Sequence, residues 1–407
     1  MTSITGLRPG CSPWPTPWAP SSSWRNVSQP KTLFTGTSGR SRAGTRSEKL
    51  VPNRIERATA LPVDLFGDEA VFELEIADIW HQDWVFACTV DAVAEPGEHV
   101  PVMIGRQPVL MVRGDDFQIR ALANVCSHRG TPLVDCAGRL SRFSCPYHAW
   151  TYGLEGDLLS VPYALPAEVG HADHGLESFL VETWHGLVFV SLNPDVEPLS
   201  TRVAAVEPYI KPLGLDRLHH DVAATMSEQW DANWKLIFGN ALDSYSHFRV
   251  HAETVEPVSP TDGSYYLAGS ARATVTGGES MERADHLVVS LPPSFVAVIY
   301  PDALVWQSVR PLTVGRTEVT TGVAGEESDA GTVVSLPGWD ASFIDEDRAI
   351  CEQVQRNVSA RWRPGPLLEL ERALGDFHAY LAWRLSDVAP EPPVVAAEPG
   401  SRPEPPL

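Results

Sequence analysis

The sequence predicts an α+β protein with two core-bearing domains, an all-β domain followed by a domain that combines an antiparallel sheet with helices. The chain has 407 residues, which is enough for two such domains and their tails. Residues 98–104, 107–113 and 117–123 are short apolar-rich runs separated by Gly and Asp, the pattern of an antiparallel meander. Residues 264–324 contain further strand-like runs between segments of helical spacing. These observations favour two sheets over a helical bundle.

The remaining elements follow from the spacing of apolar residues along the chain. Residues 69–84 carry apolar residues at helical intervals, so we expect a helix that leads into the first domain. The continuous apolar run 186–192 predicts one more strand of that domain. In the second domain, helical spacing predicts helices over residues 229–256, 345–358 and 366–386.

Both ends of the chain are expected to be disordered. Residues 1–55 are rich in Ser, Thr, Pro, Gly and Arg and show no periodicity, so we expect a disordered extension. An acid-poor, Ser/Arg-rich leader is also the composition of an organelle transit peptide, and this alternative to a cytoplasmic location stays open. Residues 389–407 are Pro-rich and are expected to be extended and mobile.

Composition excludes several classes of protein. The net charge of −21 argues against a nucleic-acid partner, because phosphate neutralisation needs a clustered positive surface. No apolar run approaches the length of a membrane span, so no membrane association is expected. Four of the six cysteines are widely scattered, which fits a reducing cytoplasm better than a disulfide framework.

The strongest signal of function is a pair of Cys/His motifs. Cys126-Ser-His128 is followed by Cys145-Pro-Tyr-His148, which presents two thiolates and two imidazoles in alternating order. A zinc site uses the same kinds of ligand, but finger-like sites group the cysteines and then the histidines. The order Cys, His, Cys, His favours a Rieske [2Fe-2S] cluster, in which one iron takes both cysteines and the other both histidines.

A second metal site is indicated further along the chain. His247 and His251 are four residues apart, which places them on one face of the predicted helix. One carboxylate would complete the two-His-one-carboxylate triad that binds non-haem Fe(II) and leaves positions open for oxygen. In isolation, two such histidines are more often surface or core-rim residues. An acidic segment, residues 345–347, could supply the carboxylate or could simply complement a helix dipole.

The runs 124–133 and 145–156 resemble the two cluster loops of Rieske non-haem iron oxygenases, large (alpha) subunit type. The resemblance covers about residues 60–385 and includes the segment 233–251. It implies a cluster bound by Cys126, His128, Cys145 and His148, and a mononuclear Fe(II) bound by His247, His251 and Asp347, with Glu346 the next candidate for the carboxylate. It also implies that Asp243 is the acid that links a cluster histidine of a neighbouring subunit to a histidine of the mononuclear site, while Asn240 has either a supporting or a packing role.

The chain departs from the family pattern at one position. Alignment without gaps on Tyr245 and His251 places Ser246 where the family has its first iron-binding histidine, and His247 is one residue late. A hydroxyl is a poor iron ligand compared with imidazole. On a helix, a shift of one residue rotates the side chain by about 100°. Either His247 binds iron through a local change of winding, or the site is weakened or empty.

The resemblance implies a division into a lead-in segment packed on the catalytic domain (56–75), a Rieske [2Fe-2S] domain (76–200) and a catalytic mononuclear iron domain whose antiparallel sheet wraps on a long helix (201–388). It further implies a homotrimer, with a beta subunit left open. A separate NAD(P)H-dependent reductase, with or without a ferredoxin, would supply electrons, and O₂ would hydroxylate or oxidatively demethylate a small organic substrate. The rival interpretation, supported by Ser246, is a non-catalytic electron-transfer or regulatory Rieske protein whose mononuclear site has decayed.

The substrate is left open by the sequence. Aromatic acids, polycyclic compounds and quaternary amines all fit the implied chemistry. A cationic substrate would need an aromatic cage, to which Tyr265, Tyr266 and Tyr300 could contribute, although tyrosines in strands usually serve packing.

Overall fold

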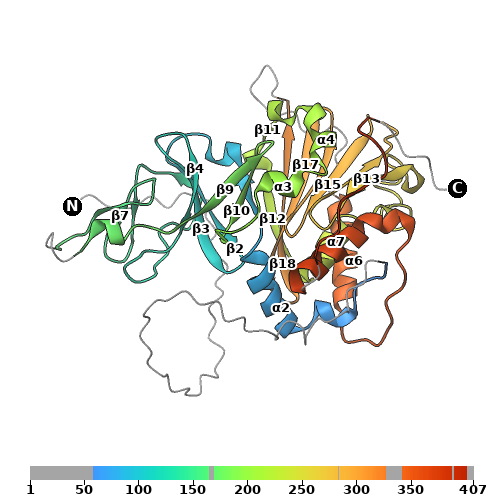
Figure 1. Ribbon diagram of the computed structural model, residues 1–407, viewed down its shortest axis with the longest axis horizontal. Coiled ribbons are helices and arrows are strands. Elements are labelled where there is room, and N and C mark those ends of the chain that lie inside the picture. Colours follow the sequence, from blue (N-terminus) through green and yellow to red (C-terminus); the bar gives the residue numbers. More distant parts are fainter. Residues whose placement is uncertain (1–57, 165–168, 283, 327–341, 387–388, 401–407) are drawn as a thin grey trace.

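The computed structural model describes residues 58–164, 169–282, 284–326, 342–386 and 389–400. Two sheets lie side by side along the long axis of the molecule, the first built from the earlier and the second from the later part of the chain (Figure 1). The predicted disordered extension, residues 1–55, lies outside the described residues.

The first half is all-β, as predicted. Its main sheet has seven strands in the order β1-β10-β9-β4-β3-β2-β5, and a smaller sheet has the order β6-β7-β8. The predicted meander is confirmed, because β2, β3 and β4 are antiparallel neighbours. The strands are β1 (Val85–Thr89), β2 (Glu98–Ile104), β3 (Gln107–Arg113), β4 (Ile119–Ala123), β5 (Gly138–Arg139), β6 (Phe143–Ser144), β7 (Thr151–Tyr152), β8 (Leu158–Ser160), β9 (Ser178–Trp184) and β10 (Leu187–Ser191).

The second half contains a nine-stranded antiparallel sheet. Its order is β11-β18-β17-β16-β15-β14-β13-β19, and β12 also pairs with β18. From β13 to β18 each strand pairs with the next one along the chain, which confirms the strand-like runs expected between residues 264 and 324. The strands are β11 (His219–His220), β12 (Met226–Trp230), β13 (Ser264–Gly269), β14 (Thr274–Gly278), β15 (His286–Leu291), β16 (Phe295–Tyr300), β17 (Ala303–Thr313), β18 (Arg316–Gly325) and β19 (Val394–Val395).

Helices surround the junction and one face of the second sheet. The lead-in helix α2 continues into a π-helical turn, η2, and α6 and α7 lie beside the second sheet in Figure 1. The helices are α2 (Glu69–Glu75), α3 (Leu199–Val203), α4 (Glu207–Ile210), α5 (Trp234–Asn240), α6 (Ser342–Gln355) and α7 (Arg372–Leu385). Shorter helical turns are η1 (Val63–Phe66), η2 (Ile76–Trp80), η3 (Val90–Val93), η4 (His171–Asp173), η5 (Lys211–Leu213), η6 (Leu215–Arg217), η7 (Val222–Ala224), η8 (Ser244–Ser246), η9 (Thr261–Gly263) and η10 (Glu369–Glu371).

The helix predicted over residues 229–256 is wrong for most of its length. Strand β12 runs to Trp230, α5 ends at Asn240, and a short 3₁₀ turn and further turns follow. Side chains compete for the backbone at this point: Asp243 Oδ1 accepts from the Tyr245 N–H at 3.1 Å, and Ser246 Oγ donates to the Asp243 carbonyl at 2.7 Å. Asp and Ser disfavour helix interiors for this reason, so apolar spacing alone overestimated the helix.

One hydrophobic core joins the two halves. The indole rings of Trp80 and Trp234 meet edge to face with centroids 5.3 Å apart, and both side chains are fully buried. Lys235 Nζ lies 2.6 Å from Glu75 Oε1, and Trp234 Nε1 donates to the other oxygen of the same carboxylate at 2.8 Å. Helix α5, which leads into the second metal site, is therefore anchored on the lead-in helix α2.

Part of the Pro-rich tail is extended, as expected, but it is docked on the sheet. Strand β19 pairs with the edge strand β13 through Val394 and Val395, and the Ala396 N–H donates to the Leu267 carbonyl at 2.7 Å. The expectation of a mobile tail therefore does not hold for this part. Residues 401–407 lie outside the described part of the chain.

Candidate iron sites

The first Cys/His loop leaves strand β4 and is closed by one buried amide. Asn124 Oδ1 accepts from the backbone N–H groups of Leu133 and Val134 at 3.0 and 3.2 Å, and its Nδ2 donates to the Val134 carbonyl at 2.8 Å. The Cys126 N–H donates to the Thr131 carbonyl at 2.8 Å. These bonds fix the turn that buries the Cys126 side chain.

The second loop is a hairpin between strands β6 and β7. The Cys145 N–H donates to the Trp150 carbonyl at 2.8 Å, and the Ala149 N–H donates back to the Cys145 carbonyl at 2.9 Å. Ala149 has a φ of 56°, a left-handed conformation that costs energy for a residue with a Cβ. Cys145 and His148 are three residues apart in the sequence, and the tight turn places both at the tip of the hairpin.

The two loops bring the four predicted cluster ligands together. The ring centroids of His128 and His148 are 4.7 Å apart, and the Cys126 and Cys145 side chains are within hydrogen-bonding reach of each other. The His128 ring stacks on Trp150 at 4.6 Å, and its Nδ1 is buried without a hydrogen-bond partner among the described residues. A buried ring nitrogen with no partner fits a metal ligand, and the set of two thiols and two imidazoles fits a [2Fe-2S] cluster.

Hydrogen bonds around the sulfurs favour the thiolate form. Burial alone would raise the pKa of Cys145, but the backbone N–H groups of Tyr147 and His148 and contacts with Cys126 lower it overall. The Tyr152 hydroxyl lies 3.2 Å from Cys126 Sγ. Such bonds stabilise negative charge on sulfur, and hydrogen bonds to the sulfurs are one of the factors that set a cluster's potential.

The predicted mononuclear site lies on the irregular segment after α5 and at the start of α6. The ring centroids of His247 and His251 are 6.1 Å apart, and His251 Nε2 lies 2.9 Å from Asp347 Oδ1. Two atoms bound to one ion at a right angle, each about 2.1 Å from it, are about 3 Å apart. The structure therefore brings all three predicted ligands to one wall of the same cavity.

The two candidate carboxylates have different contacts. Glu346 Oε2 lies 2.8 Å from Nδ1 of His251 and accepts from Thr254 Oγ1 at 2.7 Å, whereas Asp347 faces the opposite ring nitrogen. Asn240 Nδ2 donates to Asp347 Oδ1 at 2.5 Å. These contacts are compatible with the predicted ligand role of Asp347 and with a group at Glu346 that orients His251.

The pKa of His251 reflects its contacts with the two carboxylates. Burial would lower the pKa of His251, but the hydrogen bonds and charges of Asp347 and Glu346 raise it overall. Among the described residues, no group of three or more His, Cys, Asp and Glu side chains is already arranged to hold a metal ion. An ion bound by both His251 Nε2 and Asp347 Oδ1 would replace the proton that these atoms share.

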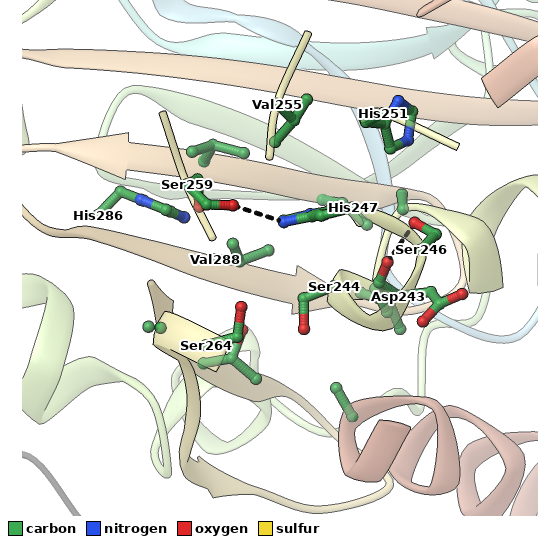
Figure 2. A pocket seen from close by; sticks show the side chains of 18 of the residues that line it. Asp243, Ser244, Ser246, His247, His251, Val255, Ser259, Ser264, His286 and Val288 are labelled. Atoms are coloured by element: carbon green, nitrogen blue, oxygen red, sulfur yellow. Dashed lines mark hydrogen bonds between the residues drawn. The ribbon is translucent and has the colours of Figure 1, made fainter. Parts of the chain in front are cut away.

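The displaced histidine, His247, is held in one orientation by a backbone contact. Its Nδ1 lies 3.1 Å from the Ser259 carbonyl, a contact that orients the ring and leaves Nε2 as the candidate ligand atom (Figure 2). Burial lowers the pKa of His247, which favours the neutral imidazole that binds metals. Ser246 instead donates its hydroxyl to the backbone carbonyl of Asp243. Because the segment is not a continuous helix, the shift of one residue does not impose a rotation of about 100°.

Asp243 lies close to the carboxylates of Asp347 and Glu371. Burial, together with the nearby charges of Glu371 and Asp347, raises the pKa of its carboxyl to about 6, although the Tyr245 N–H opposes this shift.

A cavity of about 610 Å³ extends from the candidate iron ligands across one face of the second sheet. Valines of strands β15, β16 and β17 form an apolar part of its lining, which we call the floor, and Figure 2 labels one of them, Val288. The described lining residues include six carboxylates, Asp243, Asp262, Glu279, Glu282, Asp347 and Glu369, and one guanidinium, Arg372.

Two pocket residues were missed by sequence reasoning. His286, at the start of β15, and Ser259 line the cavity, and both are more than nine-tenths buried. Neither belongs to a recognisable motif. Their position follows from the register of β15 against β14 and from the turn after residue 255, which apolar spacing does not reveal.

Comparisons with known proteins agree with this architecture. Residues 83–179 match the Rieske [2Fe-2S] domain family, and residues 215–387 match the family described as the ring hydroxylating alpha subunit, catalytic domain. The chain is 26% identical to the glycine betaine monooxygenase oxygenase subunit of Pseudomonas aeruginosa over 371 residues, covering 76% of this chain and 85% of that protein. It is 25% identical to the chloroplastic choline monooxygenase of Spinacia oleracea, covering 81% and 79% of the two chains.

Solved structures share the fold. A quaternary ammonium Rieske monooxygenase in complex with L-carnitine superposes with a TM-score of 0.71 at 20% identity, covering 83% of this chain and 99% of that chain. A naphthalene 1,2-dioxygenase variant bound to phenanthrene has a TM-score of 0.71 at 20% identity, covering 81% and 93%.

The fold is that of a two-domain iron oxygenase component, with a Rieske domain joined to a mononuclear iron domain. The chain belongs to the family of Rieske non-haem iron oxygenase large (alpha) subunits. It is a terminal oxygenase that takes electrons through a Rieske cluster to a mononuclear Fe(II) and uses O₂ to oxidise a small organic substrate. The family works with a reductase or ferredoxin and forms oligomers. The comparisons favour this function over the non-catalytic alternative.

None of the helices in the described ranges is long and apolar enough to cross a membrane.

Proposed function

We propose that this chain is the oxygenase component of a monooxygenase that oxidises an N-methyl group of a small quaternary ammonium compound. Several relatives named above act on such compounds, but the chain also has relatives that are dioxygenases, such as the 2-halobenzoate 1,2-dioxygenase large subunit of Burkholderia cepacia. Sequence similarity alone therefore does not choose the substrate class, and the proposal rests on the cavity.

The observation that carries the proposal is the charge of the cavity. Apart from Asp347, which is assigned to the iron, five carboxylates and one guanidinium line it among the described residues, so its field favours a cation and disfavours an aromatic acid. The floor of valines suits a compact methylated head group. A benzoate-like substrate would bring another negative charge into this acidic site.

All three tyrosines considered for an aromatic cage line the cavity, but their contacts differ. The Tyr265 ring packs across Gly277, its partner in the sheet. The Arg372 guanidinium already lies over the Tyr266 ring, 4.2 Å from its centroid. Tyr300 is therefore the candidate for the ring that faces a substrate cation.

The proposal assigns the four loop residues Cys126, His128, Cys145 and His148 to the cluster. The mononuclear iron is assigned to His247, His251 and Asp347, and the two domains to residues 76–200 and 201–388, after a lead-in segment of residues 56–75. When bound, the iron centres supply electron transfer and O₂ activation. The protein's own part is to orient the ligands through Ser259, Glu346 and Asn240 and to exclude water from the cavity.

The finer assignments of partners belong to the same proposal. We assign a separate NAD(P)H-dependent reductase as electron donor, and a cytoplasmic homotrimer in which Asp243 links the mononuclear site to the cluster of a neighbouring subunit. The exposed His148 at the tip of its hairpin supports electron exchange at a protein surface.

Hydroxylation of an N-methyl group consumes one O₂, two electrons and two protons and releases one water. The resulting N-hydroxymethyl group then breaks its C–N bond to give a tertiary amine, formaldehyde and a proton. Purified oxygenase with its cluster, Fe(II) and a compatible reductase should therefore release one formaldehyde per O₂ with glycine betaine, choline or carnitine. It should be inactive with benzoate and with 3,3-dimethylbutanol, the neutral carbon isostere of choline. Equal turnover of choline and its isostere, or dihydroxylation of an aromatic compound instead, would contradict the proposal.

A further inference from the structure

Three residues that line the cavity carry a buried polar atom with no hydrogen-bond partner among the described residues: Ser259, His286 and Trp306. The first two lie close together. Neither His286 Nδ1 nor Ser259 Oγ has a hydrogen-bond partner within the described ranges, although the two residues are 7% and 6% exposed. Both residues line the cavity. A buried donor or acceptor without a partner is costly, and a bound ligand would remove that cost.

The two groups lie close together beside the candidate iron site. The Ser259 carbonyl accepts from the His247 ring, and Figure 2 shows Ser259 between His247 and His286. The charge of His247 lowers the pKa of His286, which agrees with the proximity of the two rings. A ligand group bound here would thus lie within a short distance of the metal ligands.

The His286 ring is fixed in place by its neighbours. It pairs across the sheet with Gly278, and a Cβ at that glycine would come within 2.4 Å of the ring. On the adjacent strand the Tyr300 ring lies 5.5 Å away. Gly278, which has no side chain, thus leaves the space in which the ring lies.

We propose that His286 and Ser259 together bind an oxygen-bearing group of the substrate, a carboxylate or a hydroxyl. The inference rests on the proposed function, since it takes the cavity as the substrate pocket. A hydroxyl and a neutral imidazole can both donate to a carboxylate, and one can donate while the other accepts from an alcohol. With Tyr300 beside them, they would hold the polar end of a molecule whose cationic end meets that ring.

A proton-donor role for His286 fits less well. Burial, together with the charge of His247, lowers its pKa to about 4, although Asp285 opposes this shift. At pH 7 the ring would then be almost entirely neutral. A neutral hydrogen-bonding role agrees with this, whereas a general acid needs the protonated form.

The test compares ligands that carry the oxygen-bearing group with ligands that lack it, in a trimethylammonium series and in an aromatic series. Binding to the purified holoenzyme is measured by calorimetry for glycine betaine, choline and ethyltrimethylammonium, and for benzoate and toluene. Variants His286→Leu and Ser259→Ala remove the hydrogen bonds, His286→Asn retains one near Nδ1, and Val298→Ile changes the pocket floor without touching a polar group. Thermal melting confirms that each variant is folded.

The wild type should prefer the oxygen-bearing ammonium ligand by about 10-fold or more. His286→Leu and Ser259→Ala should each remove most of that preference, His286→Asn should restore part of it, and Val298→Ile should keep it. The choline and betaine arms decide between a hydroxyl and a carboxylate. A preference that is unchanged in His286→Leu and Ser259→Ala would overturn the inference while leaving the proposed substrate class intact. If ammonium ligands do not bind but the benzoate–toluene difference depends on His286, the substrate class fails and the inference stands.

Discussion

The two iron-binding regions of this molecule are built in different ways. The cluster loops are local: Cys126 to His148 is a short stretch, and its turns are closed by hydrogen bonds within each loop. The mononuclear site joins residues about a hundred positions apart, and Asp347 reaches His251 only because α6 packs against α5. A local site is readable from a motif, whereas a site assembled by tertiary packing depends on elements that the motif does not specify.

The largest expected effect concerns the local site. Cys145→Ser should abolish the visible absorbance of the cluster and lower turnover by about a thousandfold or more, because a hydroxyl replaces a thiolate ligand. Cys136→Ser is the matched control, since Cys136 is a partly exposed cysteine outside the predicted ligand set. Retention of a full cluster in Cys145→Ser would refute the ligand assignment.

The second prediction separates the two carboxylates of the assembled site. Asp347→Asn should remove most of the mononuclear iron and nearly all O₂-dependent turnover, while the cluster absorbance is unchanged. Glu346→Gln, which weakens only the contact that orients His251, should reduce iron affinity by about 10- to 100-fold. Metal analysis after dialysis against graded chelator measures both, and a larger loss in Glu346→Gln would reverse the two roles.

The third prediction tests how the assembled site depends on distant packing. Glu75 and Lys235 form a fully buried ion pair. Glu75→Gln should leave an unpaired buried charge and lower the free energy of unfolding by about 3–5 kcal/mol. Glu73→Gln, which breaks an exposed ion pair on the same helix, is the control and should change stability by less than about 1 kcal/mol. Urea denaturation followed by tryptophan fluorescence would show equal effects if the buried pair had no anchoring role.

The smallest expected effect concerns the cation. Tyr300→Leu should raise KM for a quaternary ammonium substrate by about 3- to 30-fold, because a cation–π contact contributes roughly 1–2 kcal/mol when desolvated. Tyr300→Phe keeps the ring and should stay within about twofold of the wild type. If steady-state kinetics give the same KM for the Tyr300→Leu and Tyr300→Phe variants, Tyr300 has no part in substrate recognition.

The sequence was sufficient for the fold class, the meander and the cluster motif, since each depends on short-range spacing. It misjudged the segment after Asn240, because apolar periodicity does not register the backbone hydrogen bonds that Asp243 and Ser246 form. It also overlooked His286, whose place in the cavity depends on strand register and on a glycine in the neighbouring strand. The conflict at Ser246, in contrast, was visible in the sequence, but only the turn geometry shows how His247 can take that role.

The central claim is that His247, not Ser246, completes the mononuclear site. Iron and sulfide analysis of the wild type, His247→Ala and Ser246→Ala tests it most directly. We expect about three irons and two sulfides per chain in the wild type and in Ser246→Ala, and about two irons and two sulfides in His247→Ala. Three irons in His247→Ala would contradict the account.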